Sequence, residues 1–153
     1  MTTIDKAIKT QFNSEQEKAL ANILYSGNHI KHLLYNLTRP FQLNPVQYQI
    51  LVILNEAQGI PLSFDTISDR IFEKEAFSHR QFDKLLNKYL IEKIQDDFRN
   101  KVLFRVTEKG MDMASDLERR TGNYLDPLKN RINPQEARML NYILDKLRGW
   151  ENF

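Results

Sequence analysis

Apolar residues recur at intervals of three and four along most of the chain, which is the spacing of amphipathic helices. The first such stretch follows Ser14 and Glu17, which have the spacing of a capping box, and it ends at Pro40 because proline breaks the helix. A second helix begins at 44–47 (Asn-Pro-Val-Gln), which supplies an N-cap, a first-turn proline and a capping-box partner. Since 48–54 is apolar on nearly every side, we expect this helix to be central and buried.

The middle of the chain changes from a helical period to an alternating one. Two short helices are predicted over 64–72 and 78–89, and strands follow over 90–94 and 101–106. The polar stretch 95–100 between the strands is typical of a hairpin tip. Two strands after two short helices predict a winged helix-turn-helix core, so the expected fold class is mainly α with a small β-hairpin wing.

The remainder of the chain is predicted to be helical. Thr107 caps one further helix, and 133–136 (Asn-Pro-Gln-Glu) opens the last one, which runs to about Arg148. The apolar stripe of the last helix could close over the protein's own core, or it could pack with the first helix against a second copy. A monomer would leave this stripe uncovered, so we favour a homodimer. The stripe consists of Leu140, Ile143, Leu144, Leu147 and Trp150.

Composition narrows the possible chemistry. Among 153 residues the formal net charge is only +2, which by itself does not predict binding to nucleic acid. There is no cysteine, which excludes a disulfide framework, a thiolate zinc site, a cysteine nucleophile and a thiol redox switch. No apolar run approaches the roughly 20 residues needed to span a bilayer, and the first residues lack the apolar core of a signal peptide. We therefore expect a cytoplasmic protein with no membrane partner.

The sequence contains no pattern that predicts catalysis. His29 and His32 lie close together, but a zinc site would need further ligands at suitable spacing. Neither the glycines of a nucleophile elbow nor a phosphate-binding glycine loop is present among the five glycines. We expect no catalytic residues, no metal and no cofactor, and we do not expect an enzyme.

Several segments together resemble the MarR (multiple antibiotic resistance regulator) family of bacterial winged-helix transcription regulators. Residues 67–71 (Ile-Ser-Asp-Arg-Ile) look like the family's first motif helix. Arg80 and 83–86 (Asp-Lys-Leu-Leu) look like its recognition helix, and 90–93 (Leu-Ile-Glu-Lys) like its first wing strand. Residues 106–110 (Val-Thr-Glu-Lys-Gly) are similar to the segment in which the wing returns into the long dimerisation helix. A further similarity covers 43–48 (Leu-Asn-Pro-Val-Gln-Tyr), which matches the entry to the second helix.

The chain departs from the family pattern at three places. Tyr89 stands where the family usually has glycine, so the recognition helix needs another C-cap or a strained turn. The wing-tip residues 97–99 (Asp-Phe-Arg) lie one place further upstream than usual, and the loop is one residue shorter. His79 stands where a serine or threonine is common, which would alter base preference.

The resemblance implies which residues contact DNA. Base edges lie nearest the N-terminal end of a recognition helix, where Ser78, His79 and Arg80 stand. Arg80 has the geometry for a bidentate contact with guanine, and Lys84 one turn further on would contact phosphate. His79 could equally contact DNA or only lie at the surface, and a face such as Arg80-Asp83-Lys84 is commonly a solvated surface with internal ion pairs. At the wing tip the residues expected in the minor groove are Arg99, Asn100 and Lys101.

Charge agrees with this placement, because residues 77–105 hold seven basic and four acidic side chains, a net charge of +3.

The predicted division of the chain is a dimerisation region at 1–40, a winged helix-turn-helix DNA-binding core at 41–107 and dimerisation helices at 108–153.

The resemblance also implies an effector. Family members often bind small aromatic or anionic molecules between the dimer helices and the winged domain. His32, Tyr48 and Tyr124 are candidate liners of such a crevice, although residues of these types more often serve ordinary packing between helices. The leading hypothesis is a sequence-specific regulator that binds a pseudo-palindromic operator in double-stranded DNA as a homodimer and is released by the effector. The alternative is a winged-helix protein-interaction module that has lost DNA binding.

Overall fold

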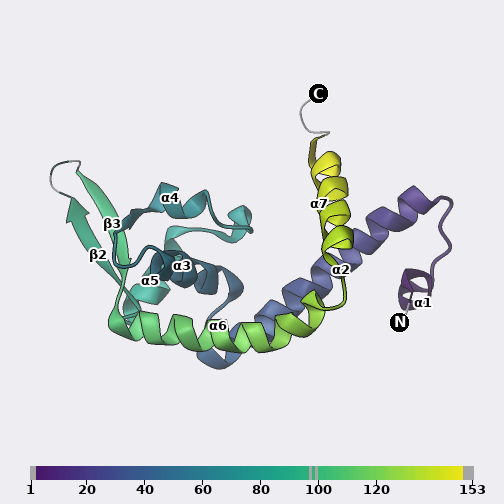
Figure 1. The fold of residues 1–153 in the computed structure, drawn as a ribbon. Helices are drawn as coiled ribbons and strands as arrows, with labels where there is room; N and C mark the ends of the chain where they lie inside the picture. Colours follow the sequence, from purple (N-terminus) through teal and green to yellow (C-terminus); the bar gives the residue numbers. More distant parts are fainter. Residues whose placement is uncertain (1–2, 97, 99, 150–153) are drawn as a thin grey trace. The chain divides into compact units, whose positions relative to one another are not determined.

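The structure is a computed structural model that describes residues 3–96, 98 and 100–149 (Figure 1). The chain forms two units, one up to Ala114 and one from Ser115 onward, and the boundary lies inside a single helix. No helix in the described ranges is long and apolar enough to cross a bilayer. In chain order the elements are α1 (Ile4–Ile8), α2 (Glu15–Thr38), η1 (Arg39–Phe41), α3 (Pro45–Glu56), β1 (Leu62–Ser63), α4 (Phe64–Ser68), η2 (Lys74–Ala76), α5 (His79–Asn87), β2 (Ile91–Asp96), β3 (Lys101–Val106), α6 (Glu108–Lys129) and α7 (Pro134–Arg148).

The predicted helix starts at α3 and α7 are both confirmed. At α3 the Gln47 N–H donates to Asn44 Oδ1 at 2.8 Å, and the Asn44 N–H donates to Gln47 Oε1 at 3.1 Å. At α7 the same exchange joins Asn133 and Glu136 at 2.9 and 2.8 Å. Both helices therefore begin where the local sequence satisfies the free N–H groups of the first turn.

The start of α2 follows the prediction only in part. The Glu17 N–H donates to Ser14 Oγ at 3.1 Å, as expected of an N-cap. The Glu17 carboxylate, however, accepts from the N–H of Asn13 at 2.9 Å rather than from the cap residue itself. The preceding helix α1 is tied to α2 by an ion pair of 2.9 Å between Asp5 and Lys18, whose hydrogen bond lowers the pKa of the Asp5 carboxyl.

The two short helices of the core end earlier than the sequence pattern predicts. Helix α4 stops at Ser68 instead of Phe72, because the N–H groups of Arg70 and Ile71 turn to carbonyls only three residues back. Helix α5 ends at Asn87, and Tyr89 follows it in the left-handed conformation with φ of +58°.

Tyr89 closes α5 with the geometry that glycine usually provides. Its N–H bonds to the carbonyl of Leu86 at 2.9 Å, and the next N–H, of Leu90, bonds to Leu85 at 3.0 Å, which is the pattern of a Schellman motif. The Tyr89 carbonyl accepts from the hydroxyl of Thr107 at 2.8 Å. The side chain is 76% exposed, so the ring causes no crowding and the strain is confined to the backbone.

The wing belongs to a sheet of three antiparallel strands in the order β1-β3-β2, one strand more than the predicted hairpin. The third strand, β1, has only two residues and pairs Leu62 with Phe104 and Ser63 with Leu103. A strand of this length has no alternating pattern to detect in the sequence. Strands β2 and β3 pair from Ile91↔Val106 to Asp96↔Lys101, so β2 runs two residues beyond its predicted end.

The core of the first unit forms around α3, which is buried as predicted. Helix α3 packs against α4, α5 and β3, and α5 also packs against β2. Each fully buried leucine, isoleucine or phenylalanine contributes roughly 1.5–3 kcal/mol. The largest side chains in this core are Ile50, Leu51, Leu54, Ile67, Phe82, Leu85 and Leu90.

The return from the wing into α6 requires a glycine. Thr107 caps α6, since its hydroxyl accepts from the N–H of Gly110 at 3.1 Å, and its own N–H bonds to the Leu90 carbonyl at 3.1 Å. This brings Gly110 so close that a Cβ there would overlap the Leu90 carbonyl oxygen and lie 2.7 Å from Val106 Cγ2. The first turn of α6 can pack against the base of the wing only if residue 110 has no side chain.

We predict that Gly110→Ala lowers the free energy of unfolding by about 1–3 kcal/mol or more, because the added methyl group forces the first turn of α6 away from the Leu90 carbonyl. Gly27→Ala in α2 is the matched control, since a Cβ there meets nothing within 4 Å. It should raise stability by about 0.5–1 kcal/mol through helix propensity. Urea denaturation of both variants measures the difference, and equal stability of the two would contradict the close approach.

In the second unit, α7 exposes most of its apolar residues. Leu140 and Ile143 are both close to half exposed. Met139 and Tyr142 are exposed as well. Trp150, the last member of the predicted stripe, lies outside the described residues.

Candidate nucleic-acid interface

Helix α5 presents a polar face to solvent because its inner face is anchored. Phe82 and Leu85 are 1% and 0% exposed, which fixes the rotation of the helix. The helical period then places His79, Arg80, Asp83 and Lys84 outside, and all four are exposed. Ser78 holds the N-cap position without a side-chain capping bond, so its hydroxyl stays available to an outside partner.

The basic side chains of this face, Arg80 and Lys84, have no acidic partner among the described residues. Arg80 and Lys84 form no ion pair with any residue in the described ranges, although Asp83 stands between them on the helix. Behind the face, by contrast, Lys88 Nζ donates to the Gln42 carbonyl at 2.6 Å, and Arg105 pairs with Glu92 at 2.7 Å. The expected alternative, a solvated surface with internal ion pairs, does not describe Arg80 and Lys84 within that part of the chain.

A set of amide hydrogen bonds attaches α5 to the start of α3. Gln81 Oε1 accepts from Asn44 Nδ2 and from Gln47 Nε2, both at 3.0 Å, and Gln81 Nε2 donates to the Ala76 carbonyl at 3.2 Å. Gln47 is only 3% exposed, so its amide depends on these partners. Gln81 was not predicted from the sequence, since nothing local connects it to residues more than thirty positions earlier.

We predict that Gln81→Leu lowers the free energy of unfolding by about 1–3 kcal/mol, because the buried Gln47 amide loses its acceptor. Gln81→Glu is the control: its carboxylate still accepts from Asn44 and Gln47 and loses only the bond to Ala76. Gln81→Glu should therefore lower the free energy of unfolding clearly less than Gln81→Leu does. Thermal unfolding followed by circular dichroism compares the three proteins, and a Gln81→Leu protein as stable as the wild type would contradict the role of these bonds.

The wing places two of its three predicted DNA-contacting residues at its tip. Lys101 begins β3 opposite Asp96, and Asn100 precedes it with φ of +47° in the left-handed region that asparagine tolerates. Both side chains are exposed, as is Phe98 on the same turn. Arg99 lies outside the described residues.

The structure describes the side chains of two of the three candidate effector residues, and these two do not line the same hollow. His32 is exposed on α2 and lines a surface hollow with Asn28, Lys31, Tyr35, Asn36 and Arg39. Tyr48 is half-buried on α3 and does not line that hollow. The side chain of Tyr124 on α6 lies outside the described residues.

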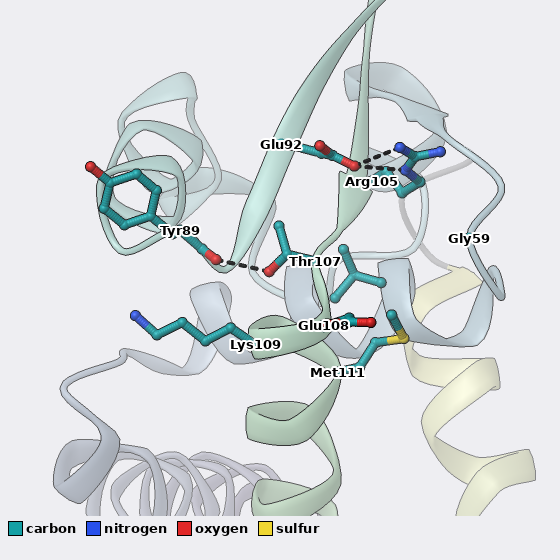
Figure 2. A pocket seen from close by; sticks show the side chains of 9 residues that line it. Gly59, Tyr89, Glu92, Arg105, Thr107, Glu108, Lys109 and Met111 are labelled. Carbon is teal, nitrogen blue, oxygen red and sulfur yellow. Dashed lines mark hydrogen bonds and ion pairs between the residues drawn. The ribbon is translucent and has the colours of Figure 1, made fainter.

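A separate cavity of about 600 Å³ lies at the base of the wing, and Figure 2 shows the residues around it. It contains none of the predicted site residues. Its polar groups bond to one another: Arg105 to Glu92, and Thr107 to the Tyr89 carbonyl. Lys109 Nζ donates to the Lys88 carbonyl at 2.8 Å. These bonds stabilise the junction between the wing and α6, and the cavity is a consequence of that junction.

No cluster of three or more metal-ligating side chains occurs among the residues whose structure is described.

No family model matches the sequence, and no curated protein sequence matches it either. Solved structures do match over most of their length. The organohalide-sensing RdhR-CbdbA1625 transcriptional regulator, in its ligand-free form, superimposes with a TM-score of 0.73 at 20% identity, over 93% of this chain and 83% of that one. A MarR-like transcription regulator from Bacillus cereus gives 0.71 at 12% identity, over 89% and 98%. A mutant MarR from E. coli complexed with operator DNA gives 0.65 at 20% identity, over 84% and 93%.

The chain therefore has the winged-helix fold of the MarR-type transcription regulators, mainly helical with a small antiparallel sheet. The resemblance found in the sequence is confirmed at the level of the fold, and the first two structures named above are described as transcription regulators. Within this fold, the β2–β3 hairpin is the wing and α5 is the helix that precedes it.

Proposed function

We propose that this protein is a sequence-specific transcription regulator of the MarR family that binds double-stranded DNA in the bacterial cytoplasm. The observation that carries the proposal is the outer face of α5, where Arg80 and Lys84 are exposed and free of ion pairs in the described part of the chain. The other side of α5 is packed against the core, so these two cations are held at the surface without a counter-ion. Such an arrangement favours an anionic partner. One protein of this fold was solved with operator DNA.

The residues of the interface have distinct roles in this proposal. Ser78, His79 and Arg80 lie at the N-terminal end of α5 and contact base edges in the major groove, with Arg80 bidentate to guanine. Lys84, one turn further on, contacts phosphate and adds affinity without sequence information. Arg99, Asn100 and Lys101 of the wing contact the adjacent minor groove.

The active form in this proposal is a homodimer built from the terminal helices, with the chain divided at 1–40, 41–107 and 108–153. Support comes from apolar side chains that a single chain leaves exposed. Leu20, Leu24 and Ile30 on α2 are each at least half exposed, and Leu140 and Ile143 on α7 nearly so. Covering such surface is a common basis of dimerisation. Two-fold symmetry then presents two recognition helices to a pseudo-palindromic operator.

The proposal includes an effector. It is a small aromatic or anionic molecule that releases the protein from DNA. The support is the exposed face of α2, on which His32, Lys31 and Tyr35 offer polar, cationic and aromatic groups together. One protein of the same fold is described as organohalide-sensing. Tyr48 and Tyr124 remain candidate contacts of this effector.

We predict that Arg80→Ala weakens binding to the operator about 10- to 100-fold and relaxes the preference at one base pair. Lys84→Ala should weaken binding to all sequences by a similar factor and reduce the slope of log affinity against log salt by about one. Fluorescence anisotropy at several salt concentrations measures both effects.

Arg119→Ala is the matched control, because it removes one exposed arginine from α6, where Arg119 is paired with Asp116. It should bind like the wild type. An Arg80→Ala protein that folds and dimerises but binds the operator unchanged would contradict the assignment of α5. A wild-type chain that binds no DNA would favour the protein-interaction module instead.

A further inference from the structure

His79 is exposed at the first residue of the recognition helix, yet its ring is in contact with another part of the fold. The imidazole stacks on the ring of Phe64, with 4.1 Å between centroids and 19° between planes. Phe64 is the first residue of α4, fifteen positions earlier in the chain. The residue that replaces the usual serine or threonine therefore has its ring supported by another element of the fold.

Phe64 is itself in contact with two other aromatic rings. Its ring lies 4.5 Å from Phe77 and 5.3 Å from Phe82. Phe82 is 1% exposed and lies 4.4 Å from Phe104 on the wing strand β3. A continuous contact of aromatic rings thus runs from the wing, through the core, to His79 on the outer face of α5.

The backbone at Phe64 is fixed as well. Ser63, the preceding residue, pairs with Leu103 of β3. The Ser63 hydroxyl also caps α4 by accepting from the N–H of Thr66 at 3.1 Å. Phe64 consequently stands at the junction of a sheet strand and a helix, where both its backbone and its ring have few alternatives.

Stacking determines which part of the imidazole can meet a partner. One face of the ring is covered by Phe64, while the edge carries a nitrogen donor and a nitrogen acceptor. A hollow of about 170 Å³ lies beside the ring, between α5 and the wing, and is lined by His79, Asp83, Lys93 and Val102 among others. A side chain whose rotamer is fixed before binding loses less entropy when it forms a directional hydrogen bond.

We infer that His79 determines specificity by reading one base pair with the edge of its ring, and that Phe64 is the positioning residue that holds the ring for this contact. The inference rests on the proposed DNA-binding function. The chemistry of the partner is a hydrogen-bonding group on a base edge in the major groove, such as the N7 or O6 acceptor of a purine. Phe64 itself does not contact DNA in this arrangement.

The test measures the affinity of the full-length protein for the operator and for every single-base variant of one half-site. His79→Ala should lose about tenfold of the discrimination at one base pair and leave the others unchanged. Phe64→Leu removes the stacking platform and should lose about three- to tenfold at that same base pair. Phe64→Tyr keeps the ring and should restore the wild-type pattern, because Phe64 is only half-buried and has room for a hydroxyl.

The pattern across positions separates positioning from general stability, and Phe64→Met serves if Phe64→Leu does not fold. Full wild-type discrimination by His79→Ala at every position would overturn the inference. So would a Phe64→Leu protein that loses affinity equally for all variants, since that is the result of a merely structural role. If the wild-type protein distinguishes no base pair at any position, the proposed function fails. If the wild type distinguishes base pairs and His79→Ala does so equally well, only the inference about His79 fails.

Discussion

The packing of α5 against α3 is the constraint on which the candidate interface depends. Phe82 and Leu85 bury the inner face of α5, and Gln81 joins that face to the N-terminal cap of α3 through two hydrogen bonds of 3.0 Å. Apolar burial alone fixes the helix against the core but tolerates small rotations and slides. The directional amide bonds define one register, because a buried Gln47 without its acceptor is costly. The outward position of Arg80 follows from this register.

The wing is attached to the same helix by different means. At its base, Thr107 and Gly110 bring the first turn of α6 against the Leu90 carbonyl, immediately after the left-handed turn at Tyr89. Further out, the rings of Phe104 and Phe82 join β3 to the middle of α5. The two elements proposed to contact DNA are therefore held together at two places. The distance between α5 and the wing is therefore set by packing within the protein and not by the DNA.

What could be predicted from the sequence is what local chemistry decides. The caps at Asn44 and Asn133 mark helix starts because their capping partners lie within three residues. At Tyr89 the family pattern predicted either another C-cap or a strained turn, and the structure has the strained left-handed turn. In contrast, β1 exists only through its pairing with β3, and the bonds of Gln81 and the stack on Phe64 join residues far apart in the chain. The outward face of α5 could be predicted from its period, but the absence of ion pairs at Arg80 and Lys84 within the described ranges could not.

Selection of bound sites from random double-stranded DNA by the wild-type protein tests the central claim most directly. A dimer with two fixed recognition helices reads two half-sites related by two-fold symmetry, one turn of DNA apart. We predict enrichment of an inverted repeat whose half-site centres lie about 10–10.5 base pairs apart. Enrichment of no sequence, or of a single half-site without an inverted partner, would contradict a dimeric, sequence-specific regulator.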